Sequence, residues 1–227
     1  MQRLRSFVYE NSLSLFFGVL LLAALTGQAI AGHDAYNEEQ QAHGGEPISL
    51  GRYLTSSAFG RAVMENWQSE YLQFSLFIFA TIWFLQRGSP ESKELGREGL
   101  ESDEDQKLGR HSSPRSPGLA RAGGLRTAIY SNSLLIVMGL IFFGSWFAHS
   151  VTGWSEFNSE QLQHGEASIS WGSYLGTSTF WEQTLQNWQS EFLAIGSMAV
   201  LSIYLRQRGS PESKPVGASH DATGVEG

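Results

Sequence analysis

Cysteine is absent from all 227 residues of the chain. A disulfide, a thiolate metal site and a cysteine nucleophile are therefore excluded. Glycine-rich phosphate-binding loops, nucleophile-elbow serines and paired zinc-binding histidines are also missing from the sequence. An enzyme is consequently the weakest of the functional classes that we consider, and no cofactor is predicted.

Positive charge is scarce as well. The chain has 15 Lys and Arg against 22 Asp and Glu, a formal net charge of −7. A nucleic-acid-binding protein would present a basic surface. We therefore predict no nucleic-acid partner.

Long apolar runs are what the sequence does have. Two runs, at residues 12–31 and 133–152, carry no charged residue, and about 20 helical residues cross the ~30 Å hydrocarbon core of a bilayer. Two further runs, at 71–85 and 192–205, are shorter. To cross a membrane, their helices must begin earlier, so we predict four spans at about 12–31, 67–86, 133–152 and 188–206.

The second half of the chain repeats the first. Asn66-Trp67-Gln68-Ser69-Glu70 recurs 121 residues later as Asn187-Trp188-Gln189-Ser190-Glu191. The same offset carries residues 86–93, Gln-Arg-Gly-Ser-Pro-Glu-Ser-Lys, onto residues 207–214 without a gap. A tandem duplication is the simplest interpretation.

A cleaved signal peptide is an alternative for the first apolar run. Arg3 and Arg5 form a basic leader, and Ala29-Ile30-Ala31 fits a cleavage site. The repeat argues against cleavage, because the matching run at 133–152 is internal and cannot be a signal peptide.

Basic residues predict the orientation. Thirteen of the 15 Lys and Arg lie before the first span, between the second and third, or at and after the end of the fourth. Only Arg52 and Arg61 lie elsewhere. The positive-inside rule then places both termini and the middle linker in the cytoplasm and the two long loops outside.

The predicted fold is an all-α membrane protein with four transmembrane helices. Two parallel two-helix repeats, residues 1–93 and 127–214, would be related by an axis along the membrane normal, with short helices in the outer loops. Gly, Ser, Pro and charge dominate the linker at 94–126, and the tail at 215–227 is similar, so both are predicted to be disordered.

Local signals predict where helices begin and end. Gly44 and Gly165 suit helix C-termini, and so do Gly88 and Gly209, which precede a proline by two residues. Arg87 and Arg208 would favour the C-terminal helix dipole. Ser56 or Ser57, and in the second repeat Thr177 or Ser178, would cap the helices that enter the membrane.

The duplicated polar string is the first candidate site. Its members are Asn66, Gln68, Ser69, Glu70, Asn187, Gln189, Ser190 and Glu191. If Glu70 and Glu191 meet inside the bundle, one carboxyl could hold a proton or a cation. If both lie among lipid headgroups or in hydrogen bonds, the string is structural, and the sequence leaves this choice open.

A second candidate lies in the outer loops. Glu39 and His43 match Glu160 and His164, and each pair is spaced to share one helical face. The histidines could simply bond the last carbonyls of a helix. The set could also bind a zinc-like ion or sense pH. His149 has Gln28 as its counterpart, which disfavours a bis-histidine haem site.

Two duplicated strings of the sequence resemble those of a known family. The duplicated Asn-Trp-Gln-Ser-Glu and Arg-Gly-Ser-Pro-Glu-Ser strings resemble a bacterial family of uncharacterised integral membrane proteins, known only as a domain of unknown function. The resemblance covers nearly the whole chain apart from the linker and tail. It implies a bacterial inner-membrane location and supplies no activity, ligand or catalytic residue.

Two functions are therefore expected. One is a small carrier or channel for protons or cations that uses the polar strings. The other is a non-catalytic scaffold or sensor of the cell envelope that acts through its outer loops. The lipid bilayer is the predicted partner, and a homo-oligomer or a further membrane partner stays open.

Overall fold

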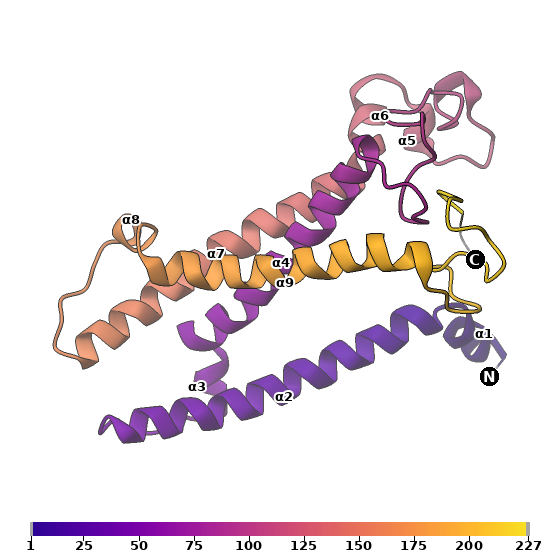
Figure 1. Ribbon diagram of the computed structural model, residues 1–227. Helices are drawn as coiled ribbons and strands as arrows, with labels where there is room; N and C mark the ends of the chain where they lie inside the picture. The colour runs from indigo at the N-terminus through magenta and orange to yellow at the C-terminus, as the bar shows by residue number, and fades with distance from the viewer. Residues whose placement is uncertain (1, 226–227) are drawn as a thin grey trace. The chain divides into compact units, whose positions relative to one another are not determined.

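The computed structural model describes residues 2–225 (Figure 1). In this range the chain forms nine α-helices, one short 3-10 helix and no strand. The all-helical part of the fold prediction is confirmed.

Helices recur at the offset seen in the sequence. Both α2, Ser12–Ala42, and α7, Ser133–Gln163, have 31 residues, while α4, Ser57–Trp83, and α9, Ser178–Tyr204, have 27. Short helices precede the latter two, α3 at Leu50–Leu54 and α8 at Trp171–Tyr174. Each helix of the second set begins 121 residues after its counterpart. The duplication itself stays a prediction.

Shorter helices flank these elements. Helix α1 spans Gln2–Glu10 and precedes α2. The linker contains a 3-10 helix at Gly109–His111 and α5 at Gly118–Arg121, and α6, Gly124–Ser131, begins at its end. Disorder of the linker and of the tail stays a prediction.

Among residues 2–225, two helices and not four are long and apolar enough to cross a membrane by themselves. They are α2 and α7, and in their most apolar 18-residue windows only 6% and 22% of residues are buried within the chain. Large apolar side chains that are exposed, such as Phe16, Leu22 and Phe143, suit a lipid environment. The predicted second and fourth spans do not qualify, because the polar strings at residues 66–70 of α4 and 187–191 of α9 lower the hydropathy of even their most apolar parts.

Helix boundaries agree with several local signals. Helix α2 ends beside Gly44, which has φ +76°, and α7 ends beside Gly165, with φ +74°. Such left-handed residues terminate helices readily when they are glycine. Ser56 Oγ accepts the Phe59 N–H at 3.3 Å, and Thr177 Oγ1 accepts the Phe180 N–H at 3.3 Å. Both predicted helix ends and both predicted N-terminal caps are confirmed.

Two predictions for the C-terminal ends were wrong. Gly88 and Gly209 do have φ values of +84° and +83°, but α4 and α9 end at Trp83 and Tyr204, several residues earlier. The glycines instead form the turns that follow. Arg206, rather than Arg208, caps α9, because its Nη1 donates to the carbonyls of Ser202 and Ile203 at 3.2 and 3.0 Å.

The chain divides into two compact units. The first unit comprises Met1–Val63 and Val151–Trp171, and the second comprises Met64–Ser150 and Gly172–Gly227. Helices α4 and α7 contribute residues to both.

Tyr53 is the centre of the first unit. It is buried in α3 and packs against Tyr36, His33 and Phe59, with ring centroids 5.5–5.9 Å apart. A Cβ on Gly32 of α2 would lie 2.4 Å from the Tyr53 hydroxyl. Gly32 therefore lets α3 approach α2 closely.

Two equivalent loops complete the first unit. The Asn37 amide exchanges two hydrogen bonds with the backbone of Ile48, at 2.8 and 3.0 Å, and Asn158 does the same with Ile169 at the same two distances. His33 and Trp154, which also occupy matching positions, add a bond to the same two carbonyls at 2.8 and 2.7 Å. The two loops therefore have matching hydrogen bonds at matching positions of the sequence.

Aromatic residues form the centre of the second unit. Trp146 of α7 stacks with Phe142 and contacts Phe180, Trp181 and Trp188 of α9, with ring centroids 5.8–6.3 Å apart. Such rings bury large apolar areas and hold helices together strongly. This aromatic cluster fixes α9 against α7.

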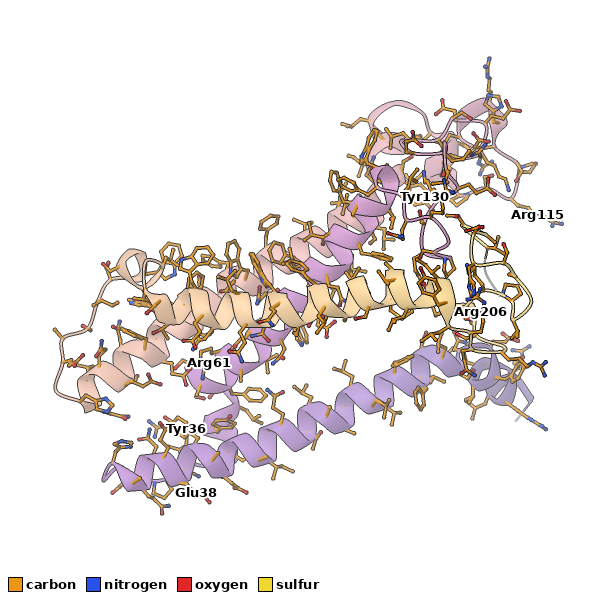
Figure 2. The ribbon with its side chains drawn as sticks, in the orientation of Figure 1. Tyr36, Glu38, Arg61, Arg115, Tyr130 and Arg206 are labelled. Carbon is orange, nitrogen blue, oxygen red and sulfur yellow. The ribbon has the colours of Figure 1, made fainter. Side chains whose placement is uncertain are left out.

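Two lysines close the turns that follow α4 and α9. Lys214 is buried, and its Nζ lies within hydrogen-bond distance of four carbonyls, those of Gly88 at 2.5 Å and of His220, Ala222 and Ser219 at 3.0–3.2 Å. Its counterpart Lys93 donates to the Gly99 carbonyl at 2.9 Å. Burial lowers the pKa of Lys214, and Arg206 lowers that pKa further. Figure 2 shows Arg206 where the tail passes the end of α9, and its Nη2 donates to Ala218 O at 3.1 Å.

Candidate functional site

The two polar strings meet each other in the second unit. Trp188 Nε1 of α9 donates to Gln68 Oε1 of α4 at 2.7 Å, and Asn187 Nδ2 donates to Glu65 Oε1 at 2.8 Å. Gln68 has no exposed surface, and its own Nε2 donates to the Glu65 carbonyl at 3.1 Å. The strings therefore join α4 to α9.

The same helices approach each other again one turn further along. Ser69 is buried, its hydroxyl donates to the Asn66 carbonyl at 2.9 Å, and it lies near the Glu191 carboxylate. Ser190 is exposed and bonds the Asn187 carbonyl at 2.8 Å. The structure thus brings together four of the predicted residues, Gln68, Ser69, Asn187 and Glu191. Glu65, which was not a predicted site residue, joins them.

Glu70 and Glu191 occupy different environments. Glu70 is exposed and Glu191 is half-buried, yet they are close enough for their charges to repel. Asn66 and Gln189 are exposed. On α4 the buried face runs through Gln68, Ser69 and Leu72, and Glu70 lies beside that face.

The two strings are identical in sequence but not equivalent in structure. Gln68 is fully buried, whereas its counterpart Gln189 is exposed. Trp188 bonds Gln68 and packs on the aromatic cluster, whereas its counterpart Trp67 is 40% exposed. Phe142 and Trp146 of α7 pack on Trp188, and the matching positions of α2 hold Leu21 and Leu25.

His149 is a buried polar residue of the aromatic cluster that was not among the predicted site residues. Its imidazole has no exposed surface and stacks on Phe180, with ring centroids 5.8 Å apart. Thr184 is also fully buried in α9. The departure of His149 from its counterpart Gln28 was the one sequence signal that marked this position.

The four candidate metal ligands lie in the first unit. The His43 and His164 rings are 5.9 Å apart, and their Nδ1 atoms bond the carbonyls of Glu39 and Glu160 at 2.9 and 2.8 Å. The prediction that these histidines bond the last carbonyls of their helices is confirmed. Within the described residues no group of three or more His, Asp and Glu is arranged to hold a metal ion. The metal site and the pH-sensing pair stay predictions.

An ion pair that the sequence did not predict joins α4 to α7 in the first unit. Arg61 Nη2 donates to Glu156 Oε1 at 3.1 Å, and Arg61 Nε bonds the other carboxylate oxygen. Arg61 is labelled in Figure 2. In the matching positions stand Glu182 and Ala35, so this pair cannot form twice and could not have been found from the repeat.

Ionisable groups around Tyr53 act on its hydroxyl. Burial raises the pKa of Tyr53, and the Glu156 carboxylate raises that pKa further, while Arg61 opposes both. The phenol therefore stays protonated through neutral pH, and the first unit keeps a neutral core beside an ion pair.

A family described as domain of unknown function DUF6766 matches residues 4–225. The chain belongs to this family. The DUF6766 match also covers the linker and most of the tail, two segments that the resemblance seen in the sequence had left out. No curated protein and no solved structure matches the chain.

Proposed function

We propose that this DUF6766 protein is a non-catalytic integral membrane protein. Its polar strings form a structural contact between α4 and α9, which we call the polar joint and which consists of Glu65, Gln68, Asn187 and Trp188. The observation that carries the proposal is the bond from Trp188 Nε1 to the fully buried Gln68 side chain. A polar group that lines an ion path must be accessible to water, and Gln68 is not. A scaffold or sensor of the cell envelope fits this joint better than a carrier.

We propose further that all four long helices cross the membrane. With 27 residues, α4 and α9 are each about 40 Å long, which exceeds the hydrocarbon core. Their low hydropathy comes from polar residues, several of which bond each other. Paired polar groups cost much less in a bilayer than unpaired ones.

The orientation in this proposal follows the basic residues. Both termini and the linker would lie on the cytoplasmic side of a bacterial inner membrane. The first unit contains the whole loop from α2 to α4 and residues 164–171 of the loop from α7 to α9. That unit would then be the surface through which the protein meets other envelope components.

A proton or cation carrier is the second candidate. It is favoured by the proximity of Glu70 to the half-buried Glu191. A carboxylate pair of this kind can hold a proton or a cation when one member is desolvated.

Flux measurements discriminate between the two candidates. The purified protein is placed in proteoliposomes, and proton and potassium flux is recorded with and without a pH gradient. We expect no flux above that of protein-free liposomes, for the chain and for Glu70→Gln/Glu191→Gln alike. Flux through the chain that the double substitution abolishes would overturn the structural joint in favour of the carrier.

A further inference from the structure

A cavity of about 180 Å³ lies in the second unit, between α4, α9 and the turns that follow them. From α4 come Gln73, Phe74 and Phe77. From α9 come Ala194, Ile195 and Met198, the residues 121 positions further along the chain. The cavity is thus lined by the same positions of both repeats.

The turns add one matched pair of carboxylates. Glu91 and Glu212, again 121 residues apart, both line the cavity. They belong to the duplicated Gly-Ser-Pro-Glu-Ser string, to which neither the polar joint nor the loops of the first unit gives a role.

Identical hydrogen bonds position the two glutamates. The Glu91 N–H donates to Ser89 Oγ at 3.2 Å, and the Glu212 N–H donates to Ser210 Oγ at 3.2 Å. Each turn is closed by a second serine, since Ser92 Oγ accepts the Gln86 N–H at 2.9 Å. Ser213 Oγ accepts the Gln207 N–H at the same distance. The string is therefore a folded turn that presents a carboxylate beside its helix.

The lining has a definite chemical character. Phe74, Phe77, Ile195 and Met198 provide apolar and aromatic walls, and the only charged residues that line the cavity are the two glutamates. Aromatic faces attract organic cations, and so do carboxylates such as those of Glu91, which is half-buried, and Glu212, which is exposed. A neutral ligand would gain no charge attraction from the glutamates, and an anion would be repelled by them.

We propose that this cavity binds a small organic ammonium cation with an apolar group, and that Glu91 and Glu212 recognise its charge. The volume agrees with that size class, since an apolar cavity of about 150 Å³ holds benzene. Such a ligand places its apolar group among the phenylalanine and methionine side chains and its ammonium group towards the turns. The site needs no ion movement across the membrane, so it is independent of the flux result.

Benzyltrimethylammonium is a suitable probe. Binding to the full chain in detergent micelles or nanodiscs is measured by isothermal titration calorimetry. Neutral benzyl alcohol and anionic benzenesulfonate serve as ligand controls. We expect saturable binding of one benzyltrimethylammonium per chain and at least about tenfold weaker binding of both controls, as expected when a charge contact is lost.

Two kinds of variant locate the site. Glu91→Gln/Glu212→Gln removes the charge, and Ala194→Phe fills the cavity while it keeps the charge. Each should weaken binding about tenfold or more. Glu98→Gln/Glu104→Gln removes two exposed acids that do not line the cavity and should leave binding unchanged. Thermal unfolding of every variant checks that it is folded.

The proposal would be overturned by no binding of benzyltrimethylammonium, by equal binding of benzyl alcohol, or by unchanged binding in a folded Ala194→Phe protein. Equal weakening by the two double substitutions would also overturn it, because attraction to the acidic chain as a whole would then explain the binding.

Discussion

Gln68 shows at the scale of one residue how an identical motif acquires two roles. Its side chain bonds Trp188 and is fully buried, while Gln189, at the same place in the second string, is exposed. A buried hydrogen-bonding group that loses its partner costs far more than an exposed one. Substitution of the two glutamines should therefore have unequal effects.

Gln68→Ala should lower the free energy of unfolding by about 1–3 kcal/mol, because the Trp188 indole N–H loses its acceptor and a cavity remains. Gln189→Ala is the matched control and should change it by less than about 0.5 kcal/mol. Thermal or denaturant unfolding in the same detergent measures both. Equal losses would mean that the two strings are equivalent and that the asymmetry is wrong.

The raised pKa of Tyr53 predicts that the stability of the protein depends on pH in the alkaline range. Burial and the Glu156 carboxylate raise its pKa above the ordinary 10.0. Since the unfolded chain loses this proton first, the contribution of Tyr53 to stability is complete below pH 10.0 and is lost as pH rises through the raised pKa.

Spectroscopy and unfolding test that sign. Phenolate absorbance in the near ultraviolet should show one tyrosine that ionises later than the others, and Tyr53→Phe should remove this late step. Tyr53→Phe should also reduce the alkaline fall in thermal stability. Tyr9→Phe, at a residue that is 82% exposed, should alter neither; the same late step in the Tyr53→Phe protein would refute the assignment.

Among the elements, α2 and α3 depend on one close approach. A Cβ at Gly32 would lie 2.4 Å from the Tyr53 hydroxyl, a distance that side chains do not reach without a shift. Gly27, in the same helix, has open space around it. Alanine at Gly32 therefore tests the packing of α3 on α2, whereas alanine at Gly27 tests helix propensity alone.

Gly32→Ala should destabilise the first unit by about 1–3 kcal/mol through overpacking. Gly27→Ala should be neutral or stabilise the helix by up to about 1 kcal/mol, because alanine is the better helix former. Hydrogen exchange of the α3 amides gives the readout. Protection of α3 that is unchanged in Gly32→Ala would show that α3 does not need this contact.

For the whole molecule, the lack of cysteine is an experimental advantage. Any single cysteine introduced is the only thiol, so its labelling reports topology directly. Ser113 in the linker and Ala167 in the loop after α7 are both exposed. In the four-span proposal they lie on opposite sides of the membrane.

Ser113→Cys should react with a membrane-impermeant maleimide only after the inner membrane is opened, whereas Ala167→Cys should react in intact spheroplasts. Ser49→Cys, in the corresponding loop of the first half, is the matched control for Ala167→Cys and should react alike. Reaction of Ala167→Cys and Ser113→Cys from the same side would exclude the four-span topology.

Much of the helical framework was determined by the sequence alone. Uncharged runs, Gly44 and Gly165 at helix ends, and the caps Ser56 and Thr177 all act locally, so their effects can be predicted from neighbouring residues. The C-terminal ends of α4 and α9 were misplaced because Gly88 and Gly209 serve turns beyond the helices rather than the helices themselves.

Only the tertiary structure decided which polar residues meet. The strings at Asn66 and Asn187 are identical, so no local rule distinguishes them. Trp188 packs on Phe142 and Trp146 of α7, whereas its counterpart Trp67 is 40% exposed. Burial depends on what lies across the helix interface, and that neighbour is distant in the chain. For this reason Gln68 is buried in the contact between α4 and α9, and Gln189 is exposed.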